Sequence, residues 1–218
     1  MKKTIFFLLC FTMLFSSAVF AQPNIDGFSA RQWLAEAEFQ FTNGDLNRCI
    51  SAATNAVTLD ESLDYAYFLR GASYSKLKVY HQAISELSTA IRLNPNDEKY
   101  YKWRGYALSK RYIYDEAIAD YSKVLQLVPN DLFALSQRGQ IYASLDKHNE
   151  AIADFDRVIN LAGRSNYFAY YWKAESCEDL GLKQQAIDNY KTFIELAQGK
   201  VKQSYITHSQ DRISELSK

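Results

Sequence analysis

The chain has few residues of the kinds that interrupt helices or bind metals. Its 218 residues include only 3 Pro and 8 Gly, beside 16 Tyr, 13 Phe and 3 Trp. Few helix breakers and many large apolar side chains predict a mostly helical protein with a filled core. The 3 Cys and 3 His leave little material for a metal cluster, and we expect no metal site and no cofactor.

The sequence also lacks an excess of one charge and the usual signatures of enzymes. Lys and Arg number 25, as do Asp and Glu, so the formal net charge is zero, which argues against nucleic-acid binding. We find no glycine-rich phosphate loop and no H-E-x-x-H, C-x-x-C or G-x-S-x-G motif. We therefore expect no catalytic residues, and an enzyme is the least favoured class.

The N-terminal residues have the pattern of a targeting segment. Residues 1–3 carry two lysines, residues 5–20 are apolar, and small residues lead to Ala21. This pattern predicts a secretory signal peptide over residues 1–21, with cleavage after Ala18 as the alternative. The apolar run is shorter than the roughly 20 residues of a spanning helix, so a membrane anchor is disfavoured. We expect a periplasmic or secreted protein without membrane insertion after cleavage.

Residues of one type recur every 34 positions in the middle of the chain. The recurring residues are Gly71, Gly105 and Gly139, then Ala83, Ala117 and Ala151, then Leu93, Leu127 and Leu161. A glycine inside a helix costs about 1 kcal/mol relative to alanine, so its recurrence implies that two backbones must approach closely. The period indicates one supersecondary unit repeated along the chain.

The pattern resembles the tetratricopeptide repeat (TPR) family, whose unit is a helix–turn–helix of 34 residues. The three middle units carry it strongly and the two outer units less so; residues 64–97, for example, carry it through Tyr67, Gly71, Tyr74, Ala83, Leu87, Ala90 and Pro95. The resemblance implies an all-α fold, a right-handed α-solenoid of about five TPR helix-turn-helix repeats plus a C-terminal capping helix. The expected TPR domain, residues 30–200, consists of units 30–63, 64–97, 98–131, 132–165 and 167–200. A tail (22–29) precedes it and a capping helix (201–218) follows.

A local sequence pattern indicates where the first helix begins. Ser29 with Gln32 forms a predicted capping box, so the first helix is expected to begin at Ala30.

Cys49 lies in the first unit and Cys177 in the fifth. Four stacked units separate them by far more than the roughly 7 Å between the Cα atoms of a disulfide. We expect two buried free thiols and no disulfide.

Carboxylates recur four residues apart in two of the units. The pairs are Glu116 with Asp120 and Glu150 with Asp154. Because these positions repeat with the fold, we interpret them as a solvated helix surface and not as a paired acid site.

In the TPR family the first helix of each unit lines a concave groove, which is the candidate site here. The resemblance implies that the groove is lined by Tyr65, Phe68, Lys76, Lys99, Lys102, Tyr106, Lys110, Phe133, Gln140, Phe168, Tyr171 and Glu175. The lysines form a basic centre, and Glu175, Glu178 and Asp179 form an acidic end. We expect an extended peptide or a helix to bind with its acidic part at the lysines. In the alternative, this is a solvated face whose aromatic rings pack between units.

These features favour a non-catalytic protein-protein interaction module, a TPR scaffold or adaptor, of the bacterial cell envelope. The alternative is a structural, self-associating subunit of an envelope assembly complex, which would form a homo-oligomer. Some TPR domains hold a C-terminal carboxylate with two lysines and two asparagines. That match is poor here. Lys102 occupies the first lysine position, but Tyr106 and Gln137 replace the two asparagines. Phe168 and Trp172 replace the other basic pair.

Overall fold

The computed structural model of the chain describes residues 27–218. The predicted signal peptide, residues 1–21, lies outside the described residues, as does most of the predicted tail.

The described residues form eleven α-helices and no strand. The helices are α1 (Ala30–Asn43), α2 (Leu46–Leu59), α3 (Asp64–Lys76), α4 (Tyr80–Leu93), α5 (Glu98–Lys110), α6 (Tyr114–Leu127), α7 (Leu132–Ser144), α8 (His148–Ala162), α9 (Tyr167–Asp179), α10 (Lys183–Ala197) and α11 (Gln203–Leu216). A short 3-10 turn, Gly163–Ser165, follows α8. The prediction of an all-α repeat fold is confirmed.

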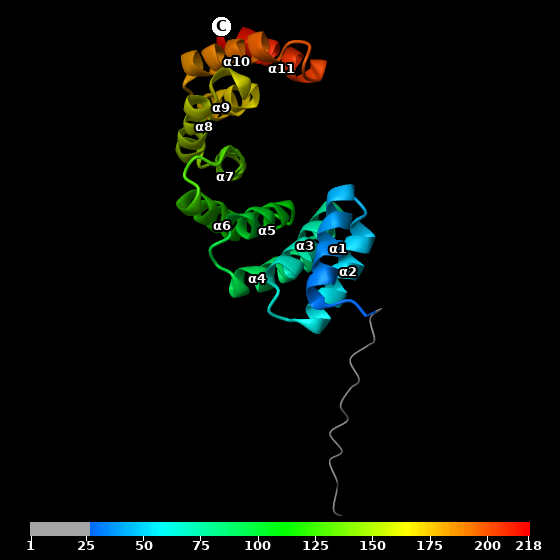
Figure 1. Cartoon of the computed structure of the whole chain (residues 1–218). Coiled ribbons are helices and arrows are strands. Elements are labelled where there is room, and N and C mark those ends of the chain that lie inside the picture. Colours follow the sequence, from blue (N-terminus) through cyan, green and yellow to red (C-terminus); the bar gives the residue numbers. More distant parts are fainter. Residues whose placement is uncertain (1–26) are drawn as a thin grey trace, which may run out of the picture.

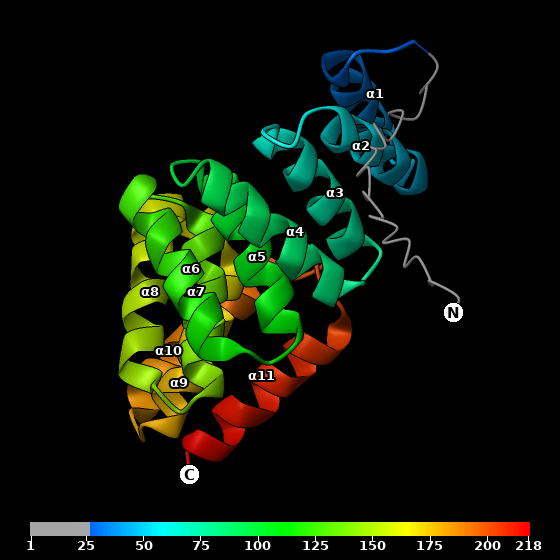
Figure 2. The ribbon, with the colours of Figure 1, turned by 90° about the horizontal axis from the view of Figure 1, so that it is seen from below.

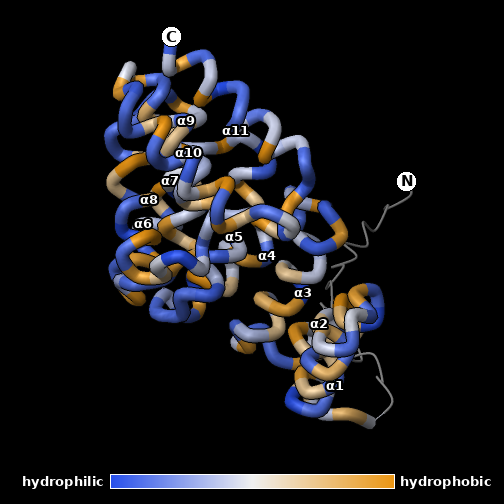
Figure 3. Tube along the Cα trace, turned by 90° about the horizontal axis from the view of Figure 1, so that it is seen from above, coloured by the Kyte–Doolittle hydropathy of each residue, from blue (hydrophilic) through white to orange (hydrophobic). Residues whose placement is uncertain are grey.

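Successive helices pair into five hairpins, which stack into an arc (Figure 1). The first helices α5, α7 and α9 lie on the inner side of the arc, and the second helices α6, α8 and α10 lie on the outer side. Helix α11 follows the last hairpin and packs against α10 (Figure 2). Hydrophobic and hydrophilic stretches alternate along the helices (Figure 3), as expected where one face of each helix is buried.

The recurring glycines stand where the two helices of a hairpin meet. A Cβ atom on Gly139 would lie 2.8 Å from Cε1 of Phe155, and one on Gly71 would lie 2.8 Å from Cγ of Leu87. Only a glycine therefore fits without displacing these buried side chains. The core itself is built from the alanines and large side chains that the period predicts, such as Ala83, Ala117 and Ala151, all fully buried.

A polar network repeats in the three middle hairpins. Arg104 of α5 donates to both carboxylate oxygens of Asp120, at 2.9 and 2.7 Å, and to Oγ of Ser88 in the preceding hairpin at 3.0 Å. Arg138 joins Asp154 and Ser122 in the same way. Arg70 joins Glu86 and Thr54.

The interpretation of Asp120 and Asp154 as solvated surface is wrong. Both residues are 3 % exposed, because each lies sixteen residues after an arginine that reaches it from the facing helix. A buried carboxylate is tolerated when it is paired and hydrogen-bonded. The network therefore ties the two helices of one hairpin to each other and to the preceding hairpin.

Turn residues and caps follow local chemistry. Ser29 and Gln32 form the predicted capping box at the start of α1. The turns inside the first and last hairpins place Gly44 and Gly181 in the left-handed region, with φ of 81° and 72°. The corresponding turns of the middle hairpins place Lys78, Tyr112 and Asp146 in that region, with φ of 63°, 60° and 57°.

Cys49 and Cys177 are free and buried, and burial raises the pKa of each thiol. Among residues 27–218, no helix combines the length and the apolar character needed to cross a membrane.

Candidate binding groove

A cavity of about 370 Å³ opens on the inner side of the second, third and fourth hairpins. We call it the basic pocket and define it by its lining residues Ser75, Lys76, Lys78, Lys102, Trp103, Tyr106 and Phe133. Helices α3, α5 and α7 supply these side chains, together with the turn after α3. Three lysines and three aromatic rings line this cavity, and no carboxylate among residues 27–218 does.

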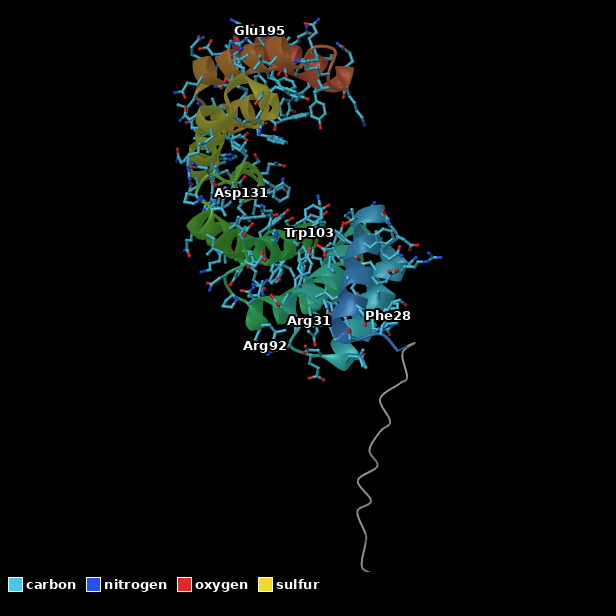
Figure 4. The ribbon with its side chains drawn as sticks, in the orientation of Figure 1. Phe28, Arg31, Arg92, Trp103, Asp131 and Glu195 are labelled. Atoms are coloured by element: carbon cyan, nitrogen blue, oxygen red, sulfur yellow. The ribbon has the colours of Figure 1, made fainter. Side chains whose placement is uncertain are left out.

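Aromatic rings form the apolar part of the basic pocket. Trp103 lies where α5 approaches α1 (Figure 4), with its ring 6.4 Å from that of Phe41 and 6.5 Å from that of Tyr106. The ammonium of Lys76 lies 4.3 Å from the centre of the Phe41 ring, and that of Lys110 lies 5.2 Å from the Tyr106 ring. Cation–π contacts of this kind hold lysine side chains against rings.

The positive charge of Lys102 is paired with a carboxylate that lies outside the predicted groove positions. Its Nζ lies 2.5 Å from Oδ2 of Asp131, and the other carboxylate oxygen of Asp131 accepts from the backbone N–H of Ala134 at the start of α7. Asp131 lies between α6 and α7 (Figure 4). The uncompensated positive charge of the basic pocket therefore comes from Lys76 and Lys78, since neither forms an ion pair within residues 27–218.

A buried hydroxyl group also faces the basic pocket. Ser75 lines the cavity, is 2 % exposed, and its Oγ has no hydrogen-bond partner among the described residues. An unpaired buried hydroxyl is costly, and a guest carboxylate would accept its hydrogen bond.

A second cavity, of about 470 Å³, lies between α7, α9 and α11. We call it the acidic pocket, since Glu175, Glu178 and Asp179 line it on the α9 side. The guanidinium of Arg212 from α11 binds the carboxylate of Glu178, which also accepts from the hydroxyl of Tyr190 at 3.1 Å. The negative charge of Glu178 is therefore paired with a residue of the same chain.

Glu175 differs from Glu178 in its surroundings. Within residues 27–218 its one ion-pair contact is with Nε2 of His208, at 3.9 Å. Partial burial raises the pKa of Glu175, although the hydroxyl of Tyr171 and the charge of His208 oppose that shift. The Glu175 carboxylate is thus partly desolvated without a lysine or arginine beside it.

The structure gathers half of the predicted groove residues around the two cavities. The basic pocket contains Lys76, Lys102, Tyr106 and Phe133, and the acidic pocket contains Gln140 and Glu175. Lys99 is exposed and lines neither pocket, and Lys110 lies over Tyr106 beside the basic pocket.

Tyr65 and Phe168 are half-buried and line neither of the two pockets. The Tyr65 hydroxyl donates to Glu38 at 3.1 Å, and burial together with that carboxylate raises the pKa of Tyr65 to about 12. The Phe168 ring stacks on that of Trp172, with centroids 5.3 Å apart.

Two predicted groove aromatics are not exposed, contrary to the sequence-based expectation. Phe68 is 5 % exposed, because its ring stacks between those of Tyr65 and Tyr100, with centroids 5.4 and 5.1 Å away. Tyr171 is 7 % exposed and packs against Tyr205 of α11. Large rings at these positions reach the gap between neighbouring inner helices, where they gain more burial than in the open groove.

Several residues of the two pockets were missed by sequence reasoning. Trp103 and Trp172 occupy one equivalent position of two units, beside the groove positions, and neither was predicted as a groove residue. Arg212 and His208 belong to α11, whose apolar spacing indicated a cap and gave no sign of polar side chains entering the groove. Among residues 27–218 no group of three or more His, Cys, Asp or Glu is placed to hold a metal ion.

Comparison with known proteins agrees with this geometry. A family profile described as tetratricopeptide repeat matches residues 64–97, 134–164 and 169–200. The chain is therefore a repeat protein with the all-α TPR fold. A search of curated proteins finds no match.

Solved TPR structures share the fold at low identity. The chain is similar to YrrB, described as a TPR protein with an unusual peptide-binding site, with 20% identity, a TM-score of 0.76, and coverage of 84% of this chain and 92% of that one. It is also similar to a MamA protein, with 20% identity, a TM-score of 0.73, and coverage of 78% and 93%. MamA of Desulfovibrio magneticus has 14% identity, a TM-score of 0.73, and coverage of 79% and 97%. At this identity the likeness concerns the fold alone.

Proposed function

We propose that this chain is a non-catalytic protein-interaction scaffold that binds a peptide or helix along the inner side of its arc. The basic pocket carries this proposal, since it combines uncompensated lysines, aromatic surface and an unpaired buried hydroxyl. Aromatic residues and cations of this kind are common anchors of binding surfaces. The description of YrrB as having a peptide-binding site is in keeping with such a role.

The chemistry of the basic pocket selects an acidic guest. A carboxylate inside it would meet the ammonium groups of Lys76 and Lys78 and accept a hydrogen bond from Oγ of Ser75. Hydrogen bonds to charged groups contribute about 1.5–3 kcal/mol each. The rings of Trp103 and Tyr106 offer contact for an apolar neighbour of that carboxylate.

Peptide binding by the purified full-length chain tests this proposal. We expect a fluorescein-labelled Gly-Glu-Leu-Glu-Gly peptide to bind more tightly than its Gln counterpart, as measured by fluorescence anisotropy. Lys76→Glu with Lys78→Glu should weaken binding about tenfold, because two attractions become repulsions. Lys191→Glu, an exposed change on α10, is the matched control. Equal binding of the Glu and Gln peptides, or equal weakening by the control, would contradict the proposal.

We assign the scaffold to the bacterial cell envelope on the predicted signal peptide of residues 1–21. Cell fractionation followed by N-terminal sequencing of the purified protein tests this assignment. The expected mature N-terminus is Gln22, in the periplasmic or secreted fraction. Retention of Met1 in the cytoplasmic fraction would refute export.

A self-associating structural subunit is the second candidate. It is favoured by α1, which packs mainly against α2 and α3 among the described helices and exposes Phe39 at 59 %. Light scattering after size-exclusion chromatography separates the candidates. A stable homo-oligomer that dissociates in the Phe39→Ser variant would favour self-association, and a monomer at all concentrations would favour the scaffold.

A further inference from the structure

The acidic pocket has features of a binding site that the capture of an acidic peptide leaves unused. Of its three carboxylates, Glu178 is held by Arg212 and Tyr190. Within residues 27–218, the ion-pair contact of Glu175 is with Nε2 of His208 at 3.9 Å, and that of Asp179 is with Nδ1 of His148 at 3.7 Å. Neither carboxylate has a lysine or arginine partner among the described residues.

An acidic cluster alone does not make a site, but a second feature points into the same cavity. Ser176 follows Glu175 on α9, lines the acidic pocket and is 1 % exposed. Its Oγ has no hydrogen-bond partner within residues 27–218. Buried polar groups in native proteins are normally paired, so this oxygen is available to accept a hydrogen bond from a guest.

An aromatic wall completes the acidic pocket. Trp172 lines it and stacks against Phe155, with ring centroids 6.1 Å apart and an interplanar angle of 29°. An indole ring is the aromatic group that attracts cations most strongly. The pocket therefore offers carboxylates, a hydroxyl oxygen and aromatic surface, which together suit an ammonium or guanidinium group.

We propose that the acidic pocket binds a lysine or arginine side chain of the guest segment whose acidic side chain lies in the basic pocket. This inference rests on the proposed function and deepens it. The guest cation donates hydrogen bonds to Glu175 and Ser176 and lies against Trp172. Helix α11, through His208 and Arg212, thus forms one wall of a binding site as well as capping the array.

The inner helices set the spacing between the two guest charges. Lys76 and Lys78 lie at and just after the end of α3 and Glu175 lies on α9, and α5 and α7 lie between these helices. Neighbouring packed helices lie about 8–10 Å apart, so the three steps from α3 to α9 span about 27 Å. An extended chain covers that distance in about eight residues, so the guest carries its acidic and basic side chains about eight residues apart.

The three tryptophans allow each pocket to be observed separately. Trp103 lines the basic pocket, Trp172 lines the acidic pocket, and Trp33 lines neither. In the full-length chain labelled with [15N]tryptophan, each indole N–H gives its own NMR signal. We expect a blocked Gly-Arg-Gly peptide to shift the Trp172 signal, and a blocked Gly-Glu-Gly peptide to shift that of Trp103. Trp33 should be unaffected by both and so reports an intact fold.

The charge of the peptide and two protein variants test the assignment of the acidic pocket as a cation site. Replacing arginine by the neutral isostere citrulline should weaken binding at Trp172 at least tenfold, and Glu175→Gln should remove that difference. Glu150→Gln, an exposed change on α8, should preserve it. A peptide with Glu and Arg about eight residues apart should bind at least tenfold more tightly than either tripeptide, because linkage raises the effective concentration.

The outcomes separate the two proposals. If the glutamate peptide shifts Trp103 while arginine and citrulline act equally at Trp172, the acidic-pocket inference is overturned and the scaffold proposal stands. If the arginine peptide acts at Trp172 as expected while no acidic peptide affects Trp103, the proposed function fails. In that case the cation site remains, but its link to an acidic anchor is refuted. If neither signal moves, both proposals fail.

Discussion

The three middle hairpins and the two end hairpins solve the same packing problem with different residues. In each middle hairpin an arginine on the first helix binds an acid on the second helix and a hydroxyl of the preceding hairpin; Asp120 and Asp154 are buried, and Glu86 is partly buried. In the first hairpin Glu36 occupies the arginine position. In the last, Lys173 occupies it and reaches back to Asp156 of the fourth hairpin, at 2.5 Å.

This difference indicates where the array needs internal polar ties. A middle unit contacts neighbours on both sides, so its arginine is flanked by protein and its charge must be paired. The last unit packs between the fourth hairpin and α11, and the acid that pairs with Lys173 has a side chain 43 % exposed. Buried pairs are costly to break from one side, whereas exposed pairs contribute little. The comparison therefore predicts unequal responses to equivalent changes.

The largest effect is expected from removing one arginine of the buried network. Arg104→Met leaves Asp120, 3 % exposed, as an unpaired buried charge. We expect the free energy of unfolding to fall by about 3–5 kcal/mol. The equivalent end change, Lys173→Met, should cost less than about 1 kcal/mol because Asp156 remains hydrated. Urea unfolding followed by circular dichroism measures both.

A double variant distinguishes an unpaired charge from lost packing. Arg104→Met combined with Asp120→Leu removes both charges and fills a similar volume, so most of the lost stability should return. If the double variant is as unstable as Arg104→Met, the cost lies in packing and the comparison between middle and end hairpins loses its electrostatic basis.

The next largest effect on stability is expected from replacing the glycines of two middle hairpins by alanine. Gly139→Ala places a Cβ 2.8 Å from Phe155, a buried ring with no room to move, and should destabilise the protein by about 1–3 kcal/mol. In Gly105→Ala the nearest atoms lie 3.2 Å away. The gain of about 1 kcal/mol in helix propensity should offset most of that strain. Thermal unfolding of the two variants measures the difference, and equal destabilisation would contradict it.

Much of the fold was predictable because the repeat reports spatial equivalence directly. Gly71, Gly105 and Gly139 share one step along the chain, and in the structure all three lie against the facing helix, with the nearest atom 2.8 or 3.2 Å from an added Cβ. The turn glycines Gly44 and Gly181 were predictable from local chemistry, since a left-handed residue ends a helix.

The polar contacts were less predictable, because they join residues whose spacing carries no local signal. The Arg104–Asp120 pair spans sixteen residues across two helices, and the Lys102–Asp131 pair links a groove position to a helix cap. The burial of Phe68 depends on the rings of Tyr65 and Tyr100, which position-by-position assignment does not consider. Sequence reasoning thus placed positions on helix faces, and packing decided which side chains reach the groove.

The smallest effect concerns the turns inside the hairpins. The end hairpins place a glycine in the left-handed region, whereas the middle ones place Lys78, Tyr112 and Asp146 there. The left-handed conformation costs a residue with a Cβ about 1 kcal/mol or more, and glycine has no such steric cost. Gly181→Ala, with open space around the added Cβ, should therefore lower stability by about 1 kcal/mol.

The reverse change in a middle hairpin should have the opposite sign. Lys78→Gly relieves the left-handed strain but increases the freedom of the unfolded chain, so we expect a gain of about 0.5 kcal/mol or less. Chemical denaturation midpoints of the two variants, measured side by side, check this. Loss of stability in Lys78→Gly would mean that the lysine side chain contributes contacts that outweigh the strain, and the middle turns would then differ from the end turns by more than backbone conformation.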